Sequence, residues 1–130
     1  MLRINPFVMG HLISAVMTGS IAGFFINAEA AFITGVSLAG GAVVSSFVCQ
    51  WRPGVDAGGG KLWAVAVLAN PIMIAALAVM ALDWQCVVGA RRGWDCVAAA
   101  MAIVAACLCL VPPLGGLLWR WWKARRAVSA

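Results

Sequence analysis

Four long apolar stretches, separated by short polar segments, dominate the pattern of this chain. Residues 6–26, 30–49, 62–82 and 96–118 contain no charged residue, and the charges gather between and after them. About 20 uncharged, mostly apolar residues are enough for a helix to cross the hydrocarbon of a bilayer. Because unpaired backbone groups are too costly in lipid, the predicted fold class is all-α, a single integral membrane domain built as a four-helix bundle.

The first span has a clear beginning and end. Asn5-Pro6 is a capping residue followed by proline at the first helical position. Residues 27–29 interrupt the apolar run and predict a very tight turn before the second span. Residues 28–30 (Ala-Glu-Ala) also have the small-x-small pattern of a signal cleavage site. The apolar region before them is longer than in a typical signal, so we expect the first helix to be retained.

Small residues recur along the first two spans. In the first, Gly10, Ser14, Thr18 and Ala22 follow one another at a spacing of four, and the second is rich in glycine, alanine and serine over residues 35–46. Such stripes let membrane helices approach closely. We therefore expect these two spans to form a tight hairpin. The alternative is that one stripe faces a partner subunit.

Proline marks the two later spans. Asn70-Pro71 lies near the middle of the third, where proline removes a backbone hydrogen bond and should kink the helix. Asn70 is expected to cap the break or to bond a neighbouring helix. Pro112-Pro113 is expected to bend or end the fourth span early. Between the second and third spans, residues 50–61 are rich in glycine and predict a flexible connector.

Composition supports a membrane environment. Hydrophobic residues make up 65% of the chain and charged residues 10%, whereas soluble domains are about half apolar and a quarter charged. The lipid bilayer is therefore the first expected partner. A net charge of +5 would also suit nucleic acid. However, the basic residues flank the apolar runs and no soluble segment is large enough for a nucleic-acid-binding module, so we expect no nucleic-acid partner.

The distribution of basic residues predicts the orientation. Four spans place both termini on one side of the membrane. The basic residues on that side are Arg3, Arg52, Lys61, Arg120, Lys123, Arg125 and Arg126, against Arg91 and Arg92 on the other. Cytoplasmic segments carry the excess of lysine and arginine. We therefore expect a multi-pass protein of a cytoplasmic (inner) membrane, with both termini cytoplasmic and residues 83–95 as an outer loop.

The last residues, 119–130, form a basic and aromatic tail. Trp119, Arg120, Trp121, Trp122 and Lys123 combine indole rings, which favour the headgroup region, with cations that attract anionic lipid. These five residues are predicted to anchor the chain at the membrane surface and to bind lipid. The tail is expected to be an interfacial helix or the frayed end of the fourth span.

The outer loop carries a pair of cysteines, Cys86 and Cys96. On the predicted outer side disulfides persist, and closing so short a loop contributes roughly 2–3 kcal/mol on the chain-entropy model. A structural disulfide is the first interpretation, and a redox-active pair is the alternative. Arg91 and Arg92, with Trp84 and Trp94 beside the cysteines, suggest a surface for docking a partner protein.

Other residues offer isolated candidates for chemistry. His11 is the single histidine and a candidate ligand for haem or a chlorophyll-type pigment; the simpler interpretation is an interfacial histidine bonded to a neighbour. Glu29 and Asn70 are candidates for an intramembrane polar site, although Glu29 also fits a turn at the start of the second helix. Cys107 and Cys109 are two residues apart and do not share a helix face, so no metal site is predicted.

No catalytic set emerges from these residues, because one histidine and four acidic residues leave little material for acid–base chemistry. We expect a non-enzymatic accessory or assembly subunit of a larger membrane complex, such as a respiratory or photosynthetic one. One alternative is a small oligomeric transporter or channel, and another is a membrane thiol-redox protein using the cysteine pair. Size and span count resemble small four-helix exporters, but the carboxylate characteristic of their first helix has no counterpart here.

Overall fold

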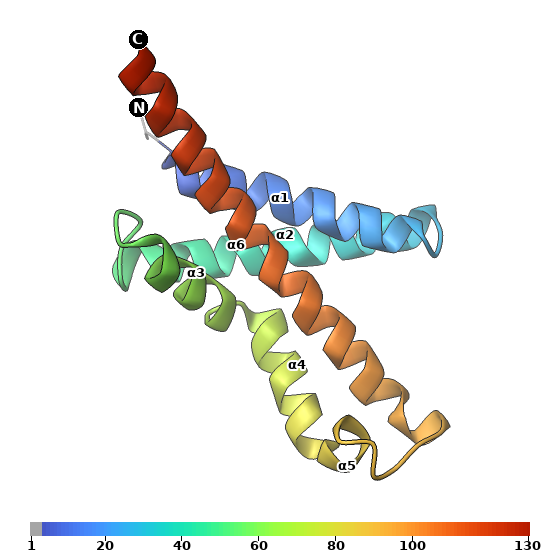
Figure 1. Cartoon of the computed structure of the whole chain (residues 1–130). Coiled ribbons are helices and arrows are strands. Elements are labelled where there is room, and N and C mark those ends of the chain that lie inside the picture. The colour runs from blue at the N-terminus through green and yellow to red at the C-terminus, as the bar shows by residue number, and fades with distance from the viewer. Residues whose placement is uncertain (1–3) are drawn as a thin grey trace.

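Apolar helices make up most of the computed structural model, which describes residues 4–130 (Figure 1). Arg3, counted above among the basic residues, lies outside this range. The helices are α1 (Pro6–Phe24), α2 (Ala28–Trp51), α3 (Gly59–Leu68), α4 (Pro71–Leu82), the short α5 (Trp84–Val87) and α6 (Val97–Ser129), with a 3-10 turn, η1 (Trp94–Cys96), before α6. The all-α fold expected from the apolar pattern is confirmed.

The tight turn expected after the first span is present between α1 and α2. Three residues separate the two helices, and the side-chain oxygen of Asn27 accepts a hydrogen bond from the N–H of Ala30 at 2.8 Å. Asn5 caps α1 in the same way, accepting from the N–H of Phe7 at 3.0 Å. Asparagine therefore begins both helices by satisfying backbone donors that have no partner within the helix.

The contact between α1 and α2 depends on glycine. A methyl group added at Gly19 would lie 2.8 Å from the Cα atom of Gly35, so a larger residue would push the two backbones apart. The Thr34 hydroxyl lies in the same contact and donates a hydrogen bond to the carbonyl of Gly19. The expected hairpin is thus confirmed, and its helices approach most closely along Gly19 and Gly23.

The stripe that begins at Gly10 serves a different contact. A methyl group added at Gly10 would lie 2.5 Å from Cβ of Trp119 and 2.8 Å from the carbonyl oxygen of Gly115, both in α6. Ser14, the next member of the stripe, lies against Gly115. This part of α1 therefore packs on α6, while the part around Gly19 packs on α2.

The fourth span does not end at its proline pair. α6 runs for 33 residues with Pro112 and Pro113 inside it, so of the two expected effects, a bend or an early end, the early end is wrong. Proline at these positions removes the donors for the carbonyls four residues earlier. Trp63 of α3 donates its indole N–H to the nearby carbonyl of Leu110 at 3.2 Å. The carbonyls that lose their helical donors are those of Leu108 and Cys109, so this bond does not replace the lost ones. It ties α3 to α6 beside the proline pair.

The third span is broken rather than gently kinked. The axes of α3 and α4 differ by 65° across the break. The side-chain oxygen of Asn70 accepts a hydrogen bond from the N–H of Ile72 at 2.9 Å, and Pro71 occupies the first turn of α4, where its missing N–H costs nothing. The expected capping role of Asn70 is therefore confirmed.

The helices form two crossing layers (Figure 1). α6 runs obliquely across the α1–α2 hairpin and contacts α1, whereas α4 follows the first half of α6 and α3 lies against α2. The core at the crossing consists of Ala15, Leu38, Ala42, Val67, Met73 and Cys109, and a second cluster of Phe7, Cys49, Leu62 and Ala66 lies nearby. The arrangement differs from a regular four-helix bundle because the break at Asn70 turns α4 away from α2.

The surface of these layers is strongly apolar. α1, α2 and α6 are each long and apolar enough to cross a membrane, and α3 with α4 makes a fourth span if the bent pair crosses as one. Many large side chains, including Met17, Phe25 and Phe32, are exposed. Apolar surface of this extent requires lipid or a protein partner to cover it. These features indicate a multi-pass membrane protein.

Candidate functional site

The segment between α4 and α6 folds into a closed loop. The Sγ atoms of Cys86 and Cys96 lie 2.13 Å apart, at disulfide distance, and their Cα atoms are 5.4 Å apart. Within the loop, Arg91 donates from Nη2 to Oδ1 of Asp83 at 3.3 Å. An exposed ion pair contributes little stability. The expected pairing of the two cysteines is confirmed, and it fixes the ends of the loop.

The closed loop presents two tryptophan rings. Trp84 is 61% exposed and Trp94 is 91% exposed. The ion pair of Arg91 with Asp83 leaves Arg92 as the arginine of this loop without an ion-pair partner among residues 4–130. The four residues predicted to form a docking surface thus lie in one loop. One of its two arginines, Arg91, is already paired with Asp83.

His11 lies inside the protein, between α1 and α2. The residue has no exposed surface, and its Nδ1 atom lies 3.0 Å from Oγ of Ser46. Nε2 is buried and has no hydrogen-bond partner within residues 4–130. The ring of Phe7 lies 5.4 Å away, centroid to centroid. A haem or chlorin would need an open face beside a ring nitrogen, and the enclosed imidazole offers none in this arrangement.

Asn70 is buried at the break between α3 and α4, with 1% of its surface exposed. A methyl group added at Gly41 of α2 would lie 2.5 Å from Oδ1 of Asn70 and 3.1 Å from its Nδ2, so the amide packs directly on the backbone of α2. The absence of a side chain at Gly41 makes room for this polar group. The break is thus held both by the cap and by contact with a second helix.

Glu29 lies far from this break. It is exposed in the first turn of α2, where the helix dipole favours a carboxylate. Gly41, the contact of Asn70, is twelve residues further along the same helix, about 18 Å away. The structure therefore places Glu29 in the turn and does not bring it together with Asn70 in one polar site.

Two residues of the predicted membrane anchor face the protein. Cβ of Trp119 lies at the crossing of α6 with Gly10. Arg120 donates from Nη1 to the carbonyl oxygens of Val55 at 3.0 Å and Ala57 at 2.9 Å. We call this contact the Arg120 clamp. It ties the second half of α6 to the loop between α2 and α3.

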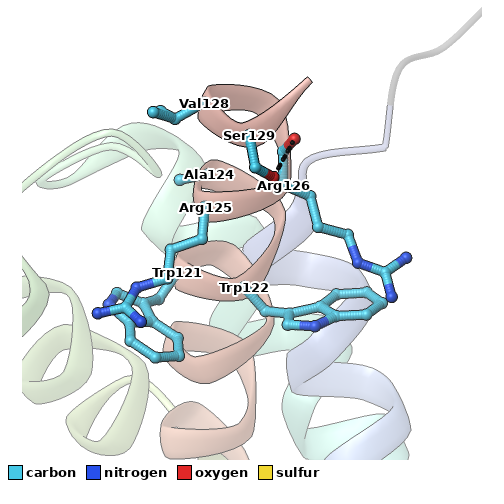
Figure 2. A pocket seen from close by; sticks show the side chains of 7 residues that line it. All are labelled: Trp121, Trp122, Ala124, Arg125, Arg126, Val128 and Ser129. Carbon is cyan, nitrogen blue, oxygen red and sulfur yellow. Dashed lines mark hydrogen bonds between the residues drawn. The ribbon is translucent and has the colours of Figure 1, made fainter.

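The remaining aromatic and basic residues of the tail are exposed (Figure 2). The guanidinium carbon of Arg125 lies 3.9 Å from the centroid of the Trp121 ring, and that of Arg126 lies 3.7 Å from the Trp122 ring. Each pair is four residues apart along the helix, the spacing at which side chains meet. The exposed surface of the tail is therefore built from two arginine–tryptophan stacks, and Lys123 is exposed as well.

The remaining cysteines lie in the helices. Cys49 and Cys109 are buried in the two apolar clusters, and Cys107 is exposed on α6. Within residues 4–130, no group of three or more histidine, cysteine or acidic side chains is placed to hold a metal ion. These thiols behave as small apolar side chains in the packing.

Three contacts were not foreseen from the sequence. Ser46 was counted among small residues, and nothing in the local sequence marks it as the partner of His11. Likewise, the Arg120 clamp joins segments more than 60 residues apart. The stacks of Arg125 and Arg126 were not predicted either, although their spacing of four residues from the preceding tryptophans is visible in the sequence.

Comparison with protein-family models, with curated proteins and with solved structures finds no match for this chain. The function is therefore argued from the exposed loop, the helix break and the tail described above.

Proposed function

We propose that the chain is a small non-enzymatic protein of a cytoplasmic (inner) membrane that serves as an accessory or assembly subunit of a larger membrane complex. The larger complex in this proposal is of the respiratory or photosynthetic type. In this proposal both termini lie on the cytoplasmic side, and the loop closed by Cys86 and Cys96 lies on the opposite side.

The Arg120 clamp supports this orientation. It holds the loop of residues 52–58 against the second half of α6, so this loop and the basic tail belong to the same side. The closed loop lies at the other end of α6 (Figure 1). Its cysteine pair suits a compartment outside the cytoplasm, where disulfides persist.

The exposed ring of Trp94 is the observation that carries the proposal. The ring is 91% exposed beside a disulfide-closed loop, with Arg92 nearby in the sequence. Tryptophan and arginine dominate the binding energy of protein interfaces, especially when they are held in place before binding. Tryptophan also favours the lipid headgroup region. A partner protein and the bilayer surface are therefore the two candidates to cover this ring.

A matched pair of variants separates these two candidates. Trp94→Ala removes the ring from the closed loop, and Trp51→Ala removes another exposed ring from the opposite end of the protein. After extraction in mild detergent, we expect the wild type and Trp51→Ala to migrate with the same defined set of membrane proteins, and Trp94→Ala to lose them. Migration of the wild type as a homo-oligomer alone would contradict the proposal.

A small oligomeric transporter or channel is the second candidate, favoured by the helix break at Asn70. Transporters often place polar groups at broken helices near the middle of the membrane. In this case the purified protein in proteoliposomes should conduct protons or cations, as measured with a trapped dye. Asn70→Ala should abolish the flux, and Asn27→Ala, which removes an exposed cap, should preserve it. The absence of flux in the wild type would exclude this candidate.

Two proposals concern chemistry at single sites. A pigment on His11 would require the enclosing side chains to move, and a visible absorption band in the purified protein tests for it. A thiol-redox role would require the disulfide of Cys86 and Cys96 to exchange with a partner thiol. Trapping of a mixed disulfide by Cys96→Ser would support that role over the accessory-subunit proposal.

A further inference from the structure

The final part of α6 extends beyond the apolar layer. The apolar part of this helix, residues 97–118, is about 33 Å long, which already matches the hydrocarbon thickness of about 30 Å. The helix continues without interruption to Ser129. All residues from Trp121 to Ala130 are exposed, and Figure 2 shows the side chains of those that line the hollow at this end of the helix. This end of α6 therefore lies in the headgroup region or beyond it, on the side of the Arg120 clamp.

The charge of this segment is not compensated. Residues 119–130 contain four basic residues and no acidic residue. Arg120 is occupied by backbone carbonyls in the clamp. The single ion pair found within residues 4–130 is in the closed loop, so Arg125 and Arg126 have no acidic partner in the described part of the chain. Their positive charges are therefore available to bind an external anion.

The two stacks orient these arginines in a way that suits a phosphate group. A guanidinium group whose carbon lies within 4 Å of an indole centroid is held there by the cation–π interaction, and its N–H groups remain available to an acceptor. These N–H groups match two oxygens of a phosphate group. Trp121 and Trp122, with the exposed Ala124 and Val128, line an apolar hollow beside the guanidinium groups (Figure 2). A ligand that fits both parts carries a phosphate next to an apolar chain.

We infer that Arg125 and Arg126, stacked on Trp121 and Trp122, form a binding site for the phosphate groups of anionic phospholipids on the clamp side of the membrane. The arginines bind phosphate oxygens, and the indoles contact the glycerol and upper acyl region. The site is separate from the closed loop, because it lies at the opposite end of α6. The Arg120 clamp sets its height relative to the membrane by fixing the point where α6 leaves the core.

Lipid titration of the full-length protein in detergent, followed by native mass spectrometry, tests the site. The probes are phosphatidylglycerol and phosphatidylcholine with identical acyl chains. Wild type should bind phosphatidylglycerol more tightly. Arg125→Gln with Arg126→Gln should weaken phosphatidylglycerol binding by about 30-fold, the usual contribution of two basic residues at an anionic surface. Binding of phosphatidylcholine should weaken much less, because its choline cation cancels the charge of its phosphate group.

Arg91→Gln with Arg92→Gln is the matched control, since it removes the same charge from the closed loop. It should leave phosphatidylglycerol binding within about 2-fold of wild type. Equal losses in both double variants, or equal binding of the two lipids by wild type, would overturn the site. Both arginines of the tail are exposed, so their replacement should not change the helical content by circular dichroism.

A conservative variant tests the role of the stacks. Arg125→Lys with Arg126→Lys keeps both charges but loses the planar fork. We expect phosphatidylglycerol binding to weaken at least 3-fold. Wild-type affinity in this variant would show that charge alone binds the lipid and would overturn the proposed geometry.

Discussion

Glycine residues of α2 and its neighbour α1 occupy two different kinds of position. At Gly19 an added methyl group would lie 2.7 Å from the carbonyl carbon of Thr34 and 2.8 Å from Cα of Gly35, and neither backbone atom can move aside easily. At Gly40 an added methyl group would meet nothing within 4 Å. Gly19 therefore sets the distance between two helices, whereas no described neighbour requires a glycine at position 40.

Alanine substitutions at these two positions should have opposite effects. Gly19→Ala should destabilise the fold by about 1–3 kcal/mol, because it forces the hairpin apart. Gly40→Ala should be neutral or stabilise by up to about 1 kcal/mol, because alanine is the better helix former. The free energy of unfolding can be measured by titration with denaturing detergent and circular dichroism. Equal effects at both positions would show that Gly19 is not the contact that sets the helix separation.

At the scale of the helices, local signals predicted where α1 and α4 begin, but not the start of α3 at Gly59, which lies inside the segment expected to be a flexible connector. Asn5, Asn27 and Asn70 each cap a helix by accepting a hydrogen bond from one neighbouring N–H group, and such contacts depend only on nearby sequence. The end of the fourth span was not predictable in this way. Pro112 and Pro113 normally break helices, but here they lie fully buried within α6. Packing against other helices stabilises α6 at these prolines, and the local sequence does not reveal that packing.

The local sequence also does not reveal which helices pack against one another. The stripe at Gly10 and Ser14 correctly indicated a close helix contact. A spacing of four residues does not, however, identify the helix that packs against the stripe. The helix that packs against the stripe is α6, which contacts it through Gly115 and Gly116. Because α6 is about 100 residues further along the chain, proximity in sequence favoured α2 as the partner of this stripe. α2 does pack on α1, but around Gly19 rather than at Gly10 and Ser14.

The Arg120 clamp leads to a prediction for the loop between α2 and α3. Arg120→Gln removes the hydrogen bonds to the carbonyls of Val55 and Ala57, and bonds to a charged donor contribute about 1.5–3 kcal/mol. Amide hydrogen exchange in residues 54–61 should therefore increase by at least about 10-fold. Lys123→Gln removes an exposed charge three residues away and should leave exchange unchanged. Similar exchange in both variants would mean that the loop is ordered without the clamp.

For the whole molecule, the candidate surfaces were more predictable than the interior. The cysteine pair, the exposed tryptophans of the loop and the basic tail are all visible as residue types at the ends of apolar runs. The interior contact of His11 with Ser46 and the packing of Asn70 on Gly41 depend on how α1, α2 and the broken third span come together. Such contacts follow from the crossing of two layers, which the linear pattern of spans does not specify.

The orientation of the whole molecule gives the last prediction. Single cysteines introduced at exposed positions report the side of the membrane on which they lie. If both termini are cytoplasmic, as proposed, a membrane-impermeant maleimide should label Ala28→Cys, at the start of α2 beside the α1–α2 turn, in intact spheroplasts. Asp56→Cys and Ser129→Cys, joined to one side by the Arg120 clamp, should be labelled only after permeabilisation.

The native cysteines provide the control for this experiment. Cys86 and Cys96 are paired, Cys49 and Cys109 are buried, and Cys107 lies on the apolar part of α6. The wild-type chain should therefore remain unlabelled until a reductant is added, and should then take up two labels from the outside. Because the clamp joins residue 56 to the tail, labelling of Asp56→Cys and Ser129→Cys from opposite sides would contradict the fold itself. Labelling of both from outside would instead reverse the orientation and place the closed loop in the cytoplasm.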